Sequence, residues 1–255
     1  MGESGLRVRR DDGVLRITFD KPDRLNALTA EMIEAASDAV EAAASDGTRV
    51  IVLTGEGRAF SAGADVGPDG AAPGLSTLDA ANRFTLAVTT SPVVVVAAVN
   101  GVAAGVGCSF ALAADVTVAK ESASFMLAFT RIGLMPDGGA SLLVPAAVGR
   151  ARAARMALLA DKVTATQAAE WGLISEVVPD ADFDAHVEAL AARVAAGAPR
   201  ALAATKRIIN EATVAALPAI LAAERAGQGP LLESADFAEG VAAFQEKRTA
   251  RFTGT

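Results

Sequence analysis

The chain has 255 residues, 52% of them hydrophobic, which is enough for a sizeable buried core. Its 23 Lys and Arg stand against 30 Asp and Glu, a formal net charge of −7, and no basic stripe is present, so we predict no nucleic-acid binding. Cys108 is the single cysteine, which excludes an internal disulfide and a cysteine-based zinc site. His186 is the single histidine and lies in a polar segment typical of a solvated helix start. We therefore predict no metal site and no Ser-His-Asp triad.

The first residues, 1–5, lack the basic and then apolar pattern of a signal peptide, and Leu6 stands where a myristoylation pattern needs Ser or Thr. The longest apolar run, 92–99, is too short to span a bilayer. We expect a cytoplasmic protein with no membrane partner.

Apolar periodicity and turn signals predict the elements of the first part of the chain. In order they are a hairpin with strands at 6–10 and 14–19, a helix over 29–44 capped by Thr29, a strand at 50–54, a helix at 77–88, a strand at 93–99, a helix at 105–114, a strand at 116–119, helices at 138–148, 150–159 and 164–171, and a strand at 173–178. The recurring order of strand, strand and helix favours an α/β fold of stacked ββα units. Residues 66–76, rich in Gly, Pro and Ala, predict a mobile loop near a site.

From residue 182 onward the pattern is helical, over 182–197, 199–213, 216–227 and 231–246, with no strands left for these helices to cover. Ala-rich helices of this kind pack on one another or on another subunit. We place a boundary near Gly197, which divides the chain into a core of residues 1–196 and a helical region of residues 197–255.

Two turns of small residues, 59–65 and 100–107, each follow an apolar run that is typical of a strand. Each can present backbone N–H groups with no bulky side chain in the way. Brought together, two such turns aim a pair of donors at one oxygen, the geometry that holds a developing oxyanion. Taken singly, each turn is better explained by small residues that let a helix start pack closely on a strand.

Five motifs, in this order, resemble the crotonase (enoyl-CoA hydratase/isomerase) superfamily: Pro22–Leu28, Gly57–Asp65, Ala97–Gly101, Gly133–Gly139 and Ala168–Ile174. The resemblance runs from residue 6 to the 244–248 segment. It implies a ββα spiral core over 1–196 with a C-terminal helical oligomerisation region over 197–255, assembled as a trimer or a dimer of trimers. It also implies acyl-CoA thioester substrates, with coenzyme A as part of the substrate and no separate cofactor.

The resemblance also implies roles for particular residues. By position, the two oxyanion-hole amides fall on Ala64 and Val106. The implied substrate-binding residues are Asp23, Arg24, Leu25, Ala27, Ala62, Gly63, Asp65, Gly105, Ser109, Phe129 and Lys247. Candidates for phosphate contact are Lys21, Arg24 and the pair Lys247-Arg248, the last reaching from a neighbouring subunit; ordinary surface charge is the alternative for all of them. Many family members carry a lysine after the Gly-Ala-Asp turn, where this chain has Val66-Gly67-Pro68.

The sequence departs from the hydratase pattern at two positions. A hydratase of this superfamily uses two glutamates, which by position fall on Ser109 and Phe129, and neither side chain can act as a base. Asp137, between Pro136 and Gly138, is either the N-cap of the following helix or the catalytic acid/base found at this position in isomerases of the superfamily. The segments 125–137, 149–153, 243–248 and 251–254 most resemble the ring-1,2-epoxyphenylacetyl-CoA isomerase branch. In a dehalogenase of the superfamily the acid at the position of Asp137 is the nucleophile, and the mechanism also needs an aromatic cage. Trp171 is instead typical of a helix-end residue that packs on the core, which makes a dehalogenase the weaker alternative.

We therefore hypothesise an enoyl-CoA isomerase in which Asp137 is the single acid/base, because moving a double bond conserves atoms and one carboxylate can carry the proton. Phe129, Met126 and Phe110 are expected to dry the pocket and to raise the pKa of Asp137. The alternatives are a hydratase with a non-standard acid/base and a catalytically silent acyl-CoA-binding protein.

Overall fold

The computed structural model describes residues 5–67 and 72–255, so the expectations for residues 1–4 and for part of the 66–76 loop lie outside the described residues. The strands are β1 Leu6–Asp11, β2 Val14–Phe19, β3 Val50–Gly55, β4 Ala59–Ser61, β5 Val94–Val99, β6 Val102–Ala104, β7 Val116–Lys120, β8 Ser124–Met126, β9 Val163–Thr164 and β10 Glu176–Val178. The helices are α1 Ala30–Ala42, α2 Leu75–Thr90, α3 Val106–Ala113, α4 Ala140–Leu159, α5 Ala165–Trp171, α6 Phe183–Ala195, α7 Pro199–Thr213, α8 Leu217–Leu232 and α9 Ala235–Gln245, with 3-10 turns η1 Pro22–Arg24 and η2 Ala128–Ile132.

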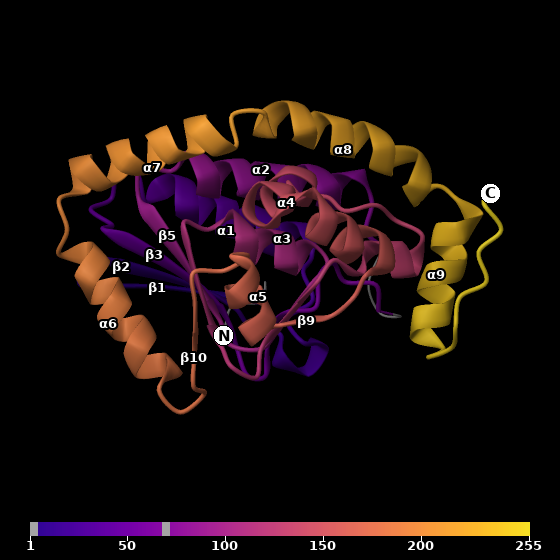
Figure 1. Cartoon of the computed structure of the whole chain (residues 1–255), viewed down its shortest axis with the longest axis horizontal. Coiled ribbons are helices and arrows are strands. Elements are labelled where there is room, and N and C mark those ends of the chain that lie inside the picture. The colour runs from indigo at the N-terminus through magenta and orange to yellow at the C-terminus, as the bar shows by residue number, and fades with distance from the viewer. Residues whose placement is uncertain (1–4, 68–71) are drawn as a thin grey trace.

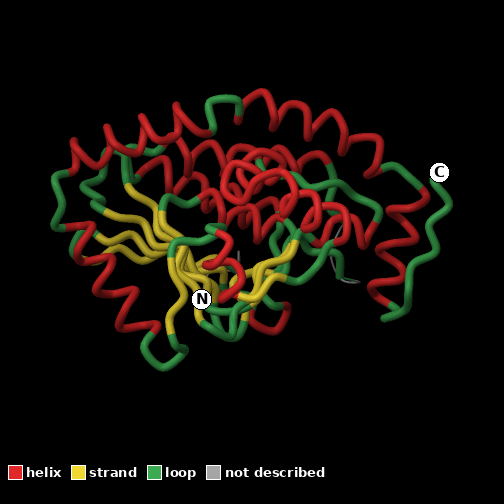
Figure 2. The backbone as a smooth tube through the Cα atoms, in the orientation of Figure 1, coloured by secondary structure: helices red, strands yellow, loops and turns green. Residues whose placement is uncertain are grey.

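The strands form two sheets, and from β3 to β8 successive strands belong alternately to one sheet and to the other. A six-stranded sheet has the order β1-β2-β3-β5-β7-β10, antiparallel between β1 and β2 and parallel elsewhere. A four-stranded sheet has the order β4-β6-β8-β9, and its β4–β6 and β6–β8 pairs are parallel. A strand of the larger sheet, a strand of the smaller sheet and a helix follow one another three times. The three units are β3, β4 and α2; β5, β6 and α3; and β7, β8 and α4. This is the predicted ββα spiral, and the α/β fold class is confirmed (Figure 2).

Strand β3 shows why the larger sheet is covered on both faces. Its alternate residues point to opposite sides, and all four of Val50, Ile51, Val52 and Leu53 are buried. Ile51 and Leu53 join the main core with α1, α2 and α3, while Val50 and Val52 join a second cluster that contains residues of α6. The expectation that the helices after residue 182 have no strands to cover is therefore wrong for α6, which packs on the sheet.

Two further sequence expectations need correction. The predicted break between 227 and 231 is absent, because α8 continues through Pro230 to Leu232. The strands of the smaller sheet were not predicted at all; each is two or three residues long. In contrast, the separation of two helical segments at Gly149 is correct, since its φ of 75° and ψ of 166° interrupt α4. Trp171 packs partly buried against the core, as predicted.

The last helices lie along the outside of the molecule, with α7 and α8 following one side and α9 at one end (Figure 1). Helix α7 is fastened by Lys206, whose Nζ lies 2.8 Å from Asp115 Oδ2 and donates to the carbonyls of Val88 at 2.7 Å and Val93 at 3.1 Å. Among the helices of residues 5–67 and 72–255, none is long and apolar enough to cross a membrane.

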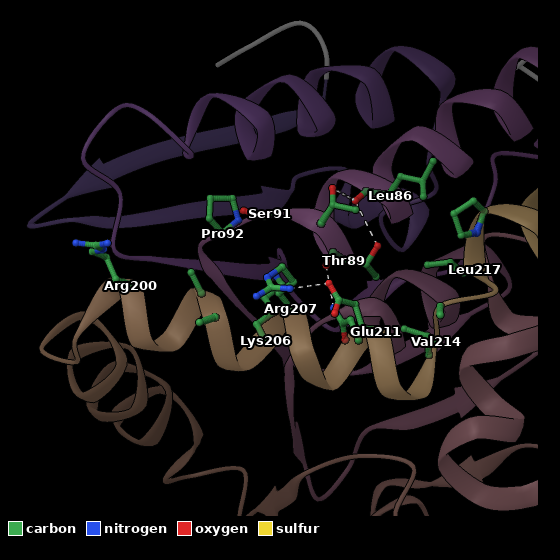
Figure 3. A pocket seen from close by; sticks show the side chains of 16 residues that line it. Leu86, Thr89, Ser91, Pro92, Arg200, Lys206, Arg207, Glu211, Val214 and Leu217 are labelled. Atoms are coloured by element: carbon green, nitrogen blue, oxygen red, sulfur yellow. Dashed lines mark hydrogen bonds and ion pairs between the residues drawn. The ribbon is translucent and has the colours of Figure 1, made fainter.

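Lys206 and Arg207 are neighbours on α7 (Figure 3), and because their ion pairs differ in burial they give a matched test. Lys206→Met leaves the partly buried Asp115 carboxylate without its partner, so we expect the free energy of unfolding to fall by about 3 kcal/mol or more. Arg207→Met removes only the exposed pair with Glu211 and should cost less than about 1 kcal/mol. Urea denaturation of both variants measures the difference, and equal losses would contradict the role given to Lys206.

Candidate active site

The first of the two predicted turns leaves one amide pointing away from its neighbouring strand segment. Leu28 donates its N–H to the carbonyl of Gly63 at 2.8 Å, and its own carbonyl accepts the N–H of Asp65 at 2.9 Å. Because residues 63 and 65 make these bonds, the N–H of Ala64 points to the opposite side. Within the described ranges, no acceptor receives it.

The second turn supplies another amide without an acceptor. Gly105, with a φ of +52°, donates to the carbonyl of Met126 at 2.9 Å and ends β6. Val106 is the first residue of α3, where a helix has no internal acceptor for its N–H groups. No other described residue accepts the Val106 N–H.

The two turns touch through their glycines. A Cβ on Gly63 would lie 3.0 Å from the carbonyl oxygen of Ala104 and 3.4 Å from the Cα of Gly105, and the φ of Gly63 is +96°. A side chain here would therefore be strained and would push the turns apart. The residues that follow the glycines, Ala64 and Val106, line the same cavity. Two residues whose amides lack partners thus border one space, an arrangement that suits an oxyanion hole.

Two asparagines hold the strand that leads into the first turn. Asn26 is fully buried and donates to the carbonyls of Glu56 at 2.9 Å and Ala59 at 2.7 Å. Asn100 donates to the carbonyls of Gly57 at 2.8 Å and Ala59 at 3.2 Å. These bonds explain why the 22–28 and 97–101 motifs accompany the two turns.

The cavity measures about 590 Å³ and gathers most of the residues implied by the resemblance. Those that line it are Asp23, Arg24, Leu25, Ala27, Ala62, Gly63, Ala64, Asp65, Gly105, Val106, Phe129 and Asp137. Met126 also lines it, as expected for the residues that dry the pocket.

Five expected residues lie elsewhere among the described part of the chain. Ser109 is fully buried and does not line the cavity, and its hydroxyl donates to the backbone carbonyl of Asp137 at 2.8 Å. Phe110 packs on Phe84, with ring centroids 4.4 Å apart, and does not contribute to drying the cavity. The other three are Lys21, Lys247 and Arg248, none of which lines the cavity, and Arg248 is paired with Glu239 at 2.6 Å.

Asp137 is not the N-cap of α4. Gly138 and Gly139, with φ of +64° and +86°, separate it from the helix, which begins at Ala140. Its side chain is turned into the protein: Oδ2 accepts a hydrogen bond from Gln228 Nε2 at 2.9 Å. Oδ1 is buried and has no partner among the described residues. Asp137 thus presents one unpartnered carboxylate oxygen in a cavity that it lines.

Burial raises the pKa of Asp137 to about 7, because a charged carboxylate loses its hydration there. The hydrogen bond from Gln228 lowers this pKa, and the nearby charge of Glu224 raises it. Glu224 is 1% exposed, and it, rather than Asp137, accepts hydrogen bonds at the start of α4. Its partners are the N–H groups of Gly139 at 2.8 Å and Ser141 at 2.9 Å. A carboxyl group with a pKa near 7 can exchange a proton in either direction at neutral pH.

Sequence reasoning missed the part of the cavity wall that the C-terminal helices supply. Gln228 and Leu232 of α8 and Phe244 of α9 line it, and Gln245 donates from Nε2 to the carbonyl of Val66 at 2.9 Å. The cavity is therefore covered by the last helices of its own chain. The missed signal is that Glu224 and Gln228 fall on the same face of α8 as the buried Leu217 and Leu221, where a polar residue needs a buried partner.

A second hollow of about 650 Å³ lies between the end of α2 and α7, and Figure 3 shows the side chains that line it. Its buried charge is Lys206, which already has two carbonyls and Asp115 as partners. The hollow therefore lacks the unpartnered acid that distinguishes the cavity around Asp137.

The ββα spiral is that of the crotonase superfamily. The chain belongs to the enoyl-CoA hydratase/isomerase family, whose model matches residues 9–255. It is 49% identical to a probable enoyl-CoA hydratase of Rhodobacter capsulatus over 254 residues, 98% of each chain. It is 40% identical to the 1,2-epoxyphenylacetyl-CoA isomerase of Escherichia coli over 252 residues, 96% of each chain. Among solved structures, an enoyl-CoA hydratase from Mycobacterium avium subsp. paratuberculosis matches with a TM-score of 0.93 and 48% identity, covering 98% of each chain.

Asp137→Asn should gain stability relative to the wild type as the pH rises. The pKa of Asp137 is about 7 in the folded chain, against about 3.9 for an unfolded aspartate. The folded state therefore keeps a proton that the unfolded state releases, and the wild type loses stability as the pH rises from about 4 through 7. Asparagine does not titrate, so the variant lacks this dependence of stability on pH. Between pH 5 and 8.5, the unfolding free energy of the variant minus that of the wild type should grow by about 2–3 kcal/mol in chemical denaturation; a flat difference would contradict the raised pKa.

Proposed function

We propose that this protein is an enoyl-CoA isomerase that moves the double bond of a 3-enoyl-CoA to position 2, on straight-chain or ring-derived acyl groups. The observation that carries the proposal is the pairing of one buried carboxylate with two amides. Asp137 has an unpartnered oxygen, and Ala64 and Val106 have unpartnered N–H groups, in the same cavity.

The reaction follows from these groups. The thioester oxygen accepts the N–H groups of Ala64 and Val106, which stabilise the negative charge that forms on it. Oδ1 of Asp137 takes a proton from C2, the electron pair spreads over C2 to C4 and the oxygen as a dienolate, and the same carboxyl group returns the proton to C4. The double bond then lies between C2 and C3, and no atom is gained or lost.

The other side chains around the cavity favour isomerisation over hydration. Adding water needs a group that polarises it together with a proton donor. At the two positions implied for a hydratase, the hydroxyl of Ser109 is bonded to a carbonyl and Phe129 carries no titratable group. Of the other carboxylates that line the cavity within the described residues, Asp23 is exposed and Asp65 is paired with Arg24 at 2.7 Å.

The names of two relatives favour a hydratase as the second candidate. One is the probable enoyl-CoA hydratase of Rhodobacter capsulatus, and the other is the 2,3-dehydroadipyl-CoA hydratase of Escherichia coli, 36% identical over 253 residues. Under that reading Asp137 itself would activate water. An acyl-CoA-binding protein without turnover is the remaining alternative.

The coenzyme A end of the substrate is proposed to lie along Asp23, Arg24, Leu25 and Ala27, with the backbone of Ala62 at the adenine. All five residues line the same cavity as Asp137, which supports this placement.

Assembly through residues 197–255, as a trimer or a dimer of trimers, stays part of the proposal. It is supported by the exposed apolar side chains of Ile208 and Ile209 on α7.

The proposal is tested by incubating the protein with 3-hexenoyl-CoA and with crotonyl-CoA and identifying the products. We expect 2-hexenoyl-CoA from the first substrate and no hydration of the second. The rate should rise with pH to a plateau, with a midpoint near the Asp137 pKa of about 7. Asp137→Asn should lower kcat at least about 100-fold. Hydration of crotonyl-CoA would favour the second candidate, and binding without turnover would favour the silent protein.

Gly63→Ala tests the paired amides. The added Cβ would meet the carbonyl of Ala104 at 3.0 Å and separate the turns, so kcat should fall about tenfold or more while the acyl-CoA still binds. Gly229→Ala is the matched control, because its Cβ would meet only Leu75 Cδ2 at an ordinary 3.8 Å. Equal turnover in the two variants would speak against an oxyanion hole at Ala64 and Val106.

A further inference from the structure

The carboxamide of Gln228 is held in one orientation by the backbone of Met135. It is 1% exposed, its Oε1 accepts the N–H of Met135 at 3.0 Å, and its Nε2 donates to the carbonyl of Met135 at 2.9 Å. If Oε1 and Nε2 exchanged places, an acceptor would face the Met135 carbonyl and a donor would face the Met135 N–H. The second Nε2 proton is therefore aimed at Asp137, whose Oδ2 accepts it at 2.9 Å.

This bond makes the two oxygens of the Asp137 carboxylate unequal. Oδ2 is occupied by Gln228, and Oδ1 is the buried oxygen without a partner among the described residues. A free carboxylate turns about its last torsion, which has a broad energy profile. The bond to Gln228 restricts this rotation and settles which oxygen can take a proton.

Glu224 stands one turn before Gln228 on α8 and holds the other end of the same loop. Its two oxygens accept the N–H groups of Gly139, the second of the two left-handed glycines, and of Ser141. The loop is held from its opposite side by uncharged groups: the hydroxyl of Thr85 donates to the carbonyl of Gly138 at 3.0 Å, and Ser109 donates to that of Asp137.

We propose that α8 carries two positioning residues for the base: Gln228 orients the Asp137 carboxylate with Oδ1 toward the acyl chain, and Glu224 fixes the loop that carries Asp137. The proposal rests on the proposed isomerase function of the same cavity. The two residues act on Asp137 in opposite directions, since the Gln228 hydrogen bond favours the charged form and the Glu224 carboxylate disfavours it. The charged side chains that line the same cavity from other elements are Asp23, Arg24, Arg58, Asp65 and Arg131.

Opposite shifts are the signature to measure. Gln228→Met keeps the length of the side chain and loses the donor, so the midpoint of kcat/KM against pH should move up by about half a unit or more. Glu224→Gln removes the neighbouring charge, so the midpoint should move down. In Gln228→Met we expect kcat at pH 7 to fall about tenfold or more while KM changes less than about threefold, since the acyl-CoA contacts remain.

The control separates positioning from loss of stability. Gln167→Met removes the capping box of α5, at a distance from the cavity, and should leave both the midpoint and kcat unchanged. If Gln228→Met does not fold, Gln228→Glu keeps an acceptor for the Met135 N–H and should also raise the midpoint, because two carboxyl groups then share one site. Shifts in the same direction for the Gln228 and Glu224 variants, or no shift in either, would overturn the proposal.

A second readout keeps this proposal distinct from the proposed function. Titration of ¹³C-labelled aspartate carboxyl groups by NMR, with the Asp137 signal assigned by its loss in Asp137→Asn, reports the same midpoints without turnover. If the wild type moves no double bond, the isomerase assignment fails. The carboxyl titrations of the Gln228 and Glu224 variants then decide the positioning roles on their own, with opposite shifts as the supporting result.

Discussion

The contact between Gly63 and Gly105 sets the geometry on which the site depends. The ββα spiral places β4 beside β6, and each of these short strands ends in a turn whose glycine has a positive φ. Because neither glycine carries a Cβ, the two backbones can touch, and the amides that follow face one cavity. The donors thus belong to the main chain, and the identities of the side chains at 64 and 106 matter little to them. Any chemical specificity of the site must therefore come from the side chains that line the cavity.

The carboxyl group of Asp137 is one of those side chains, and burying a charged carboxylate is ordinarily unfavourable. Asp137 lies on a loop with two consecutive left-handed glycines, and because glycine can adopt many other conformations, such a loop is fixed only by contacts with its surroundings. Helices α2, α3 and α8 each supply that restraint, through Thr85, Ser109 and the pair Glu224 and Gln228. The Ser109 hydroxyl, which stands at one of the implied glutamate positions, is thus part of the support for the loop that carries Asp137.

Much of the fold is visible in the sequence because the larger sheet is buried on both faces, which requires long apolar runs such as 50–54 and 93–99. The smaller sheet is not visible, since strands of two or three residues are too short to show a period. The run Gly227-Gln228-Gly229-Pro230 predicts a turn, yet the helix continues there because tertiary contacts of Gln228 outweigh local propensity. In the site, the turns and Asp137 are identified by local motifs, whereas Gln228 is 91 residues from Asp137 and has no motif of its own.

That separation along the chain has a consequence for how the protein matures. The last strand of the larger sheet ends at Val178, so both sheets can assemble before α8 has left the ribosome. At that stage the loop around Asp137 lacks its two partners from α8 and the cover from α9, so the acid stays hydrated and free to turn. Under the proposed function, a nascent chain would therefore have the two turns without an oriented base until the final helices dock.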